Sequence, residues 1–297
     1  MENRGESVIK KKYIIITPIR DEERFVEKTI IAVKNQTITP IKWIFIDDNS
    51  KDGTVKVIEK FKKNQNYIEV IRMPFMTSRN PGGGVMKAFN FGYSNVRNEL
   101  EYDFVVKLDG DLSIEPDYFE AILSEFDKNS NLGIASGNII ESTTGKSYKV
   151  YNEYTLGASK VYKRECLEKI FPIEEIKGWD LLDNLMAINE GYETKLVINK
   201  YFYHLKPLDS AVGKLKESYL KGYYAGYLKY LFLFALLKIL RTCSEKPIIL
   251  GGLYFAIGYI RNVVFDRVHY KKKEIIELLH KQQKQRLLKL IKYRQVQ

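Results

Sequence analysis

Cysteine is scarce in this chain, and long apolar runs are missing. The 297 residues include only two cysteines, Cys166 and Cys243, which are too few and too far apart for a disulfide framework or a zinc ligand set. We therefore expect a reducing compartment. The first apolar run, residues 13–16, is far too short for the hydrophobic region of a secretory signal and is typical of a first β-strand.

Motifs of several common enzyme classes are also missing. Gly82, Gly83 and Gly84 are not followed by the Gly-Lys-Ser/Thr of a phosphate-binding loop, and no Gly-x-Gly-x-x-Gly joins a strand to a helix. No Gly-x-Ser-x-Gly nucleophile motif occurs either. Nucleotide hydrolysis and dinucleotide redox chemistry therefore have little support. We interpret the three glycines as a flexible loop near the ligand site, leading into a helix from Gly84.

The net charge of +11 is unevenly distributed along the chain. Residues 271–297 contain nine Lys or Arg and two Glu, so most of the positive excess lies at the C-terminal end. This distribution predicts attraction to an anionic surface, either acidic lipid or nucleic acid. A solvated basic helix without a partner is the alternative.

Short β-rich runs alternate with amphipathic stretches from residue 13 to about 205. The runs are 13–17, 43–48, 68–73 and 103–111, and the amphipathic stretches lie near 21–35, 53–64, 84–97 and 116–128. Parallel strands need helical crossovers, so this alternation predicts an α/β fold with a mainly parallel central sheet flanked by helices.

Carboxylates lie at the end of two of these runs. Asp47 and Asp48 come after the apolar residues 43–46, and Asp109 and Asp111 come after residues 104–108. Because the carboxyl ends of strands form the ligand crevice of open α/β sheets, we expect these carboxylates to converge. Asp109 and Asp111 are separated by Gly110, which allows a tight turn, and could hold a divalent cation bound to a diphosphate. Turns are rich in Asp, so an ordinary turn is the alternative.

Four segments, in order, resemble those of the family 2 glycosyltransferases, which have the GT-A fold. Residues 16–30 (ITPIRDEERFVEKTI) are similar to the opening strand and loop, with Asp21 where the family more often has Asn. Residues 43–54 (WIFIDDNSKDGT) resemble the nucleotide-recognition segment. Residues 84–92 (GVMKAFNFG) and 104–123 resemble the following helix and the metal-binding strand. The resemblance covers about the first 130 residues.

This resemblance implies roles for individual residues. The donor pocket would include Pro18, Arg20, Glu22, Asp48, Lys87, Asp109 and Gly110. Asp48 would accept hydrogen bonds from the base or ribose. Asp111 would bind Mg²⁺ or Mn²⁺, and Asp109 would bind the same metal or hold the ribose. His204 either contacts the metal or diphosphate or makes structural hydrogen bonds. We interpret Asp47, Asp52 and Glu23 as turn or cap residues.

A general base is expected on the acceptor side. The family usually supplies it from a Glu-Asp pair at the start of a helix that ends in Gly-Tyr or Gly-Trp, and residues 177–194 (KGWDLLDNLMAINEGYET) fit this pattern. Asp180, eleven positions before Gly191, is the candidate base, although Trp179 replaces the Glu. Asp183 is the second choice, and helix capping is the remaining interpretation. Residues 155–170 resemble the acceptor-side segment or are ordinary packing.

The character of the chain changes after residue 216. Lys229 and Lys238 interrupt the apolar run 221–240, and Arg261 interrupts the run 248–265. A spanning helix needs about twenty apolar residues. We therefore expect helices that lie in a bilayer interface. A buried helical hairpin, a dimer interface and a re-entrant pair are the alternatives. The predicted domains are 1–215, the GT-A domain, and 216–297, a basic helical region at the membrane.

The predicted function is metal-dependent, inverting transfer of a sugar from a UDP- or GDP-linked donor to a hydroxyl of a glycan or lipid-linked acceptor. We expect cell-surface glycan synthesis at the cytoplasmic face of an anionic membrane. We expect no nucleic-acid partner, and a homodimer is left open. A sugar-1-phosphate nucleotidyltransferase would need a glycine-rich loop that residues 17–24 lack. A non-catalytic scaffold or nucleic-acid binder would not need Asp48, Asp109, Asp111 and Asp180, since carboxylates repel phosphate without a metal.

Overall fold

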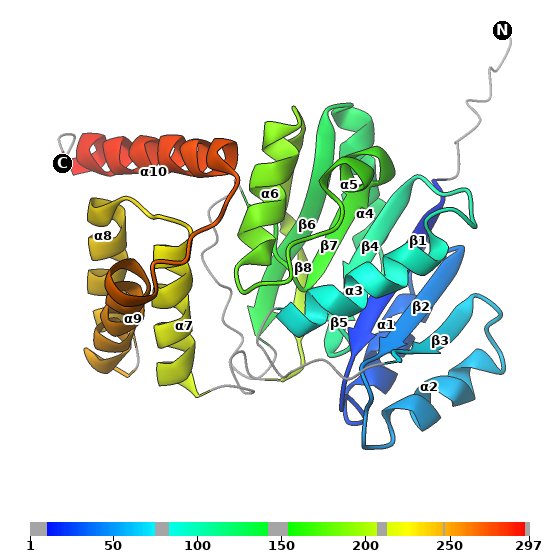
Figure 1. Cartoon of the computed structure of the whole chain (residues 1–297). Helices are drawn as coiled ribbons and strands as arrows, with labels where there is room; N and C mark the ends of the chain where they lie inside the picture. Colours follow the sequence, from blue (N-terminus) through cyan, green and yellow to red (C-terminus); the bar gives the residue numbers. More distant parts are fainter. Residues whose placement is uncertain (1–10, 75–82, 142–153, 207–212, 246, 295–297) are drawn as a thin grey trace, which may run out of the picture.

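An eight-stranded mixed sheet forms the centre of the molecule in the computed structural model (Figure 1). The structure describes residues 11–74, 83–141, 154–206, 213–245 and 247–294. The strand order is β3-β2-β1-β4-β7-β6-β8-β5. The strands are β1 (Tyr13–Ile19), β2 (Lys42–Asp47), β3 (Ile68–Arg72), β4 (Phe104–Leu108), β5 (Leu112–Ile114), β6 (Leu132–Glu141), β7 (Ser159–Lys163) and β8 (Glu193–His204).

The four strands predicted from apolar runs form the parallel half of this sheet. β1 pairs in parallel with β2 and β4, and β2 pairs in parallel with β3. The predicted α/β class is therefore confirmed. The other half is mixed, because β7 is antiparallel to both β4 and β6, β8 is parallel to β6, and β5 is antiparallel to β8.

Both faces of the sheet are covered by helices, which explains why β1 carries buried side chains on both of its sides. Ile14 and Ile16 face a core formed with α3 (Gly83–Val96), α5 (Arg164–Ile170) and α6 (Trp179–Asn189). Tyr13 and Ile15 point to the opposite core, because successive strand residues alternate in direction. That core includes α1 (Val26–Lys34), α2 (Thr54–Lys62) and α4 (Tyr118–Lys128).

The C-terminal region forms a group of helices beside the sheet (Figure 1). It contains α7 (Lys214–Tyr227), α8 (Phe232–Cys243), α9 (Leu250–Ile260), a π-helical turn (Arg261–Asp266) and α10 (Lys273–Arg294). α7 and α9 approach so closely that a Cβ on Gly222 would lie 1.9 Å from the carbonyl oxygen of Phe255. Among the helices of the described residues, none combines the length and apolar character that a bilayer crossing requires.

α10 joins this helical group to the sheet domain. Ile275, Ile276 and Leu279 are buried in the same core as α6. Further along α10, the Gln283 side chain accepts a hydrogen bond from the backbone N–H of Leu231, at the turn between α7 and α8 (2.9 Å). α10 therefore packs against both regions that the predicted boundary near residue 215 separates.

A buried ion pair lies under α6. The Lys160 ammonium donates to both carboxylate oxygens of Asp183 at 2.8 Å, and both side chains are fully buried. The Tyr162 hydroxyl donates to the same carboxylate at 2.6 Å. Burial raises the pKa of Asp183, and the Lys160 ammonium opposes that rise. The Asp183 carboxylate is thus bound inside the protein by Lys160 and Tyr162, two residues of β7.

Lys160→Met should destabilise the fold by about 3–5 kcal/mol, because it leaves the Asp183 carboxylate buried without its cation. Urea denaturation would measure the loss. The double variant Lys160→Met/Asp183→Leu should recover much of the stability, since it removes both charges. Wild-type stability in the single variant would show that this pair does not stabilise the fold.

Candidate active site

The carboxyl ends of β1, β2 and β4 meet at one edge of the sheet, as the sequence predicted. The Asp48 N–H donates to the Ile19 carbonyl at 2.9 Å, which ties the end of β2 to the end of β1. Arg20 and Asp48 form an ion pair of 3.2 Å, with Asp48 only 6% exposed. This pairing places a cation and a carboxylate together where a polar ligand would enter.

The loops around this edge explain the departure at Asp21. Asp21 has a φ of 57°, a left-handed conformation that Asn and Asp adopt more readily than most residues. Its N–H donates to the Ser50 hydroxyl (3.2 Å), and its carboxylate accepts from the Lys51 N–H (2.8 Å). An Asp at this position therefore preserves the loop that an Asn would form.

The residues interpreted as turn and cap residues make such contacts. Asp47 accepts from the Ser50 N–H at 2.9 Å, and Glu23 accepts from the Gly53 N–H at 2.9 Å. Asp52 accepts from the N–H of Thr54, the first residue of α2, at 3.0 Å. These three carboxylates shape the loops.

The Asp109-Gly110-Asp111 turn needs its glycine for space. A Cβ on Gly110 would lie 2.9 Å from the Ile19 side chain. The chain turns at Gly110 and Asp111, as the sequence suggested, and because Gly110 does not adopt a positive φ, close packing is the reason for the glycine. The Thr29 hydroxyl donates to the Gly110 carbonyl (2.9 Å) and accepts from the Leu112 N–H (3.0 Å), which fixes the turn from α1.

Asp109, Asp111 and His204 come together as a candidate metal centre. Each offers one ligand atom within 4.8 Å of the others. Antiparallel pairing of β5 with β8 brings His204 opposite Leu112, next to Asp111. His204 Nδ1 donates to the Lys206 carbonyl at 3.0 Å, since a carbonyl only accepts, and this leaves Nε2 with its lone pair in the neutral ring.

The donor set fits a hard divalent cation. Asp111 is 3% exposed, and its Oδ2 atom lies 3.0 Å from the Lys206 ammonium without forming a well-aligned hydrogen bond. Such a buried carboxylate oxygen is costly unless it has a partner. Carboxylate oxygens and an imidazole nitrogen are ligands that Mg²⁺ and Mn²⁺ accept.

Lys206 is a site residue that the sequence did not reveal. Its ammonium lies 2.5 Å from Glu22 Oε1 and 3.0 Å from Asp111 Oδ2. Burial and then the Asp111 charge raise the pKa of Glu22 to about 7, while Lys206 acts in the opposite direction. The signal was weak, because a lysine two residues after a candidate ligand is ordinary in a chain with 48 basic residues.

The two candidate bases have different surroundings. Asp180 lies in the first turn of α6, half-buried, and its carboxylate has no hydrogen bond or ion pair with any described residue. Asp183, one turn later, is fully buried against Lys160. Asp180 is therefore the more accessible of the two.

Trp179, which replaces the Glu of the Glu-Asp pattern, contacts residues on both the Asp109 side and the Asp180 side of the site. The ammonium groups of Lys107 and Lys160 lie 5.3 and 5.0 Å from the centre of its ring, within cation–π range. Lys107 pairs with Asp109 and donates to the Gly157 carbonyl at 2.8 Å. A Cβ on Gly157 would lie 3.2 Å from the Asp180 Cβ. Short contacts thus connect the Asp109 side to the Asp180 side.

The two remaining residues of the predicted donor pocket lie on α3 and β1. Lys87 is exposed on α3, and Pro18 is half-buried at the end of β1. The Asn90 side chain binds the loop after α5 through two hydrogen bonds. It donates to the Ile173 carbonyl (2.8 Å) and accepts from the Ile173 N–H (3.1 Å). Of the glycine run, Gly82 lies outside the described residues, and Gly83 and Gly84 begin α3.

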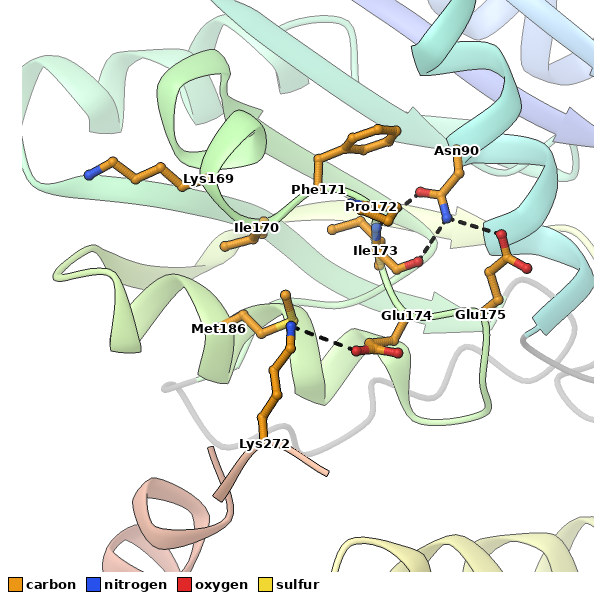
Figure 2. A pocket seen from close by; sticks show the side chains of 10 residues that line it. All are labelled: Asn90, Lys169, Ile170, Phe171, Pro172, Ile173, Glu174, Glu175, Met186 and Lys272. Atoms are coloured by element: carbon orange, nitrogen blue, oxygen red, sulfur yellow. Dashed lines mark hydrogen bonds and ion pairs between the residues drawn. The ribbon is translucent and has the colours of Figure 1, made fainter. Parts of the chain in front are cut away.

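Asn90 also lines a separate hollow of about 410 Å³ (Figure 2). Its other lining residues are Lys169, Ile170, Phe171, Pro172, Ile173, Glu174, Glu175, Met186 and Lys272. None of the carboxylates of the candidate metal centre lines it. We assign this hollow to packing between the loop after α5 and the start of α10.

Comparison with proteins of known family and structure agrees with this geometry. The minor teichoic acid biosynthesis protein GgaA of Bacillus subtilis (strain 168) is 25% identical over 229 residues, 68% of this chain and 49% of that protein. The chain spans between a quarter and a half of the length of the first curated relatives it matches.

Two solved structures share the fold. The mannosyltransferase PcManGT from Pyrobaculum calidifontis, in complex with GDP-Man and Mn²⁺, aligns with a TM-score of 0.60 and 14% identity over 88% of this chain and 89% of that one. S. aureus TarS 1–349 in complex with UDP-GlcNAc aligns with a TM-score of 0.55 and 18% identity over 86% and 73%. The structural likeness, at such low sequence identity, shows the fold alone, and this is the GT-A fold that the sequence predicted.

The family model described as glycosyl transferase family 2 matches residues 14–179, more than half of the chain and all of the segments that form the candidate site up to Trp179. The predicted family is therefore confirmed, and the chain belongs to glycosyl transferase family 2.

Proposed function

We propose that this chain transfers a sugar from a nucleoside-diphosphate donor to an acceptor hydroxyl, with inversion, in one metal-assisted displacement. The observation that carries the proposal is the meeting of Asp109, Asp111 and His204 at the carboxyl edge of the parallel strands, beside the Arg20–Asp48 pair. Solved structures of this fold are in complex with UDP-GlcNAc and with GDP-Man and Mn²⁺, which supports a UDP- or GDP-linked donor.

Asp111, Asp109 and His204 would hold Mg²⁺ or Mn²⁺. When bound, the cation supplies a Lewis acid that neutralises the departing diphosphate. Both aspartates already face an ammonium group, Asp109 that of Lys107 and Asp111 that of Lys206. Asp48 would accept from the base or ribose, with Arg20 fixing its carboxylate.

Asp180 would remove the proton of the attacking hydroxyl. Its carboxylate is half-buried and makes no bond that would have to break first within the described residues. Asp183 cannot take this part without losing the Lys160 pair that stabilises α6. Glycan synthesis at the cell surface, suggested by relatives such as GgaA, supplies such hydroxyl acceptors.

Asp111→Asn should weaken Mn²⁺-dependent binding of UDP or GDP by at least about tenfold, because a neutral amide is a poorer ligand for a hard cation. Isothermal titration calorimetry with and without EDTA would measure this binding. Asp127→Asn, a surface carboxylate paired with Lys11, is the control and should bind as the wild type does. Nucleotide binding that survives chelation in the wild type would contradict the metal role.

Asp180→Asn should keep donor binding and lower kcat by about 10²–10⁴-fold, the usual contribution of a general base. Release of nucleotide from a panel of UDP- and GDP-sugars, with candidate acceptors, would measure turnover. Glu190→Gln, at the other end of α6, should retain activity. Loss of donor binding with unchanged turnover per bound donor would overturn the assignment of Asp180.

The same proposal includes peripheral attachment to an anionic membrane through residues 216–297. Sixteen of the 21 large hydrophobic side chains exposed within the described residues lie between Phe232 and Val268. They include Phe232 (74% exposed) on α8 and Phe265 (67%) in the π-helical turn. Exposed apolar surface gathered in this way marks a contact surface.

Charge favours lipid as the occupant of this apolar surface. Residues 213–297 contain eighteen Lys or Arg and five Asp or Glu, a net charge of +13 that exceeds that of the whole chain. Exposed arginines, including Arg241, Arg261 and Arg267, lie among the apolar residues. Apolar insertion combined with basic flanks is typical of helices in an anionic bilayer interface. A second copy, with the same positive charge, would repel.

Leu240→Asp/Leu253→Asp should lower binding to phosphatidylglycerol-containing vesicles at least about tenfold, since two inserted leucines are lost. Vesicle flotation would measure the binding. Ile198→Asp, equally exposed on β8, is the control. Substitution is preferable to deletion of residues 217–297, because α10 supplies core residues to α6. Unchanged flotation, or a wild-type dimer that the double variant dissociates, would contradict the membrane role.

A further inference from the structure

Lys206 lies where a cation is needed, between two carboxylates from distant parts of the chain. Glu22 follows β1, Asp111 follows β4, and Lys206 follows β8, so the fold and not local sequence brings them together. The Lys206 ammonium contacts Oδ2 of Asp111, and Asp111 also belongs to the candidate metal centre. Lys206 is therefore in contact with a proposed metal ligand.

We infer that Lys206 is an intramolecular counterion that occupies the carboxylate cluster until a divalent cation displaces it. The inference rests on the proposed metal site. It goes beyond that site in two ways. The Lys206 ammonium competes with the metal for Asp111, and it has a second position, against the donor diphosphate.

Competition follows from the shared atom and from charge. Asp111 Oδ2 lies 3.0 Å from the Lys206 ammonium and 3.6 Å from His204 Nδ1. Two cations held a few ångströms apart on one carboxylate repel strongly in a half-buried site. A metal bound to Asp111 would therefore push the ammonium away, and the ammonium weakens metal binding by the same coupling.

The charges of the site show why the lysine is present. Glu22, Asp109 and Asp111 bring three carboxylates into one small region, and among the described residues the carboxylate paired with Lys107 is that of Asp109. Without Lys206, Glu22 and Asp111 would repel each other.

A displaced ammonium has a new partner when a donor is bound. The donor diphosphate is the anion that a metal on Asp111 would hold, so it comes within reach of a flexible lysine side chain anchored beside His204. Lys206 would then exchange a carboxylate for the diphosphate. It would act as a positioning residue that hinders binding of the metal alone and favours the metal together with the donor.

Lys206→Met tests this exchange through two binding measurements with opposite expected signs. Without nucleotide, Mn²⁺ affinity measured by electron paramagnetic resonance should increase about tenfold, because the competing charge is gone. At saturating Mn²⁺, the affinity for UDP or GDP, measured by calorimetry, should decrease about tenfold, because an ammonium–diphosphate contact is lost. A purely structural role would weaken both.

Matched variants separate charge from shape. Lys206→Arg keeps the cation and should retain Mn²⁺ affinity close to that of the wild type, whereas Lys206→Gln should behave as Lys206→Met does. Lys200→Met removes another ion-paired lysine from β8, one that binds Asp117 away from the cluster, and should change neither affinity. Thermal unfolding would confirm that each variant is folded.

Unchanged or weaker Mn²⁺ binding in both Lys206→Met and Lys206→Gln would overturn the inference. If the wild type and Asp111→Asn bound Mn²⁺ equally, the proposed metal site would fail and the inference would fail with it. Loss of Mn²⁺ binding in Asp111→Asn with no change in Lys206→Met would leave the metal site intact and reject only the role of Lys206.

Discussion

Repulsion between carboxylates is the constraint on which the rest of this structure depends. Parallel strands deliver Asp48 and Asp111 to one edge, and Glu22 follows the strand between them. Buried negative charges are costly without cations. The fold offsets each with a specific partner: Arg20 for Asp48, Lys107 for Asp109 and Lys206 for Asp111 and Glu22. The site is therefore balanced before any ligand enters.

Much of the sheet domain could be predicted because its signals are local. The run 43–48 is apolar enough to be buried on both faces, and β2 is found at Lys42–Asp47. The strand β6 was missed because Gly133, Ser136, Gly137 and Asn138 break its apolar pattern. Gly137 is needed there because a Cβ would lie 2.4 Å from the Tyr118 ring. Such a requirement comes from packing between distant segments and leaves little local pattern.

Residues of the candidate site could be predicted where they belong to a motif of a few residues. They were harder to predict where pairing between distant strands brings them to the site. Asp109 and Asp111 were found from their spacing, whereas Lys206 reaches them through the pairing of β5 with β8. In the C-terminal region, the sequence predicted helices over the interrupted apolar run 221–240 but did not give their ends. The chain turns at residues 228–231 and forms α7 and α8. The sequence put Asp180 before Asp183, and the structure adds that Asp183 is fully buried, a difference that spacing along the helix does not reveal.

The contact of Trp179 with two lysines also gives the molecule an optical reporter. The chain has only two tryptophans, and Trp43 is sealed inside the sheet with its indole N–H bound to Thr17. Trp179 instead senses the charges of Lys107 and Lys160 at its ring, next to Asp180. Indole emission follows the local electric field, so ligand-dependent changes in fluorescence will come from Trp179 against a constant signal from Trp43.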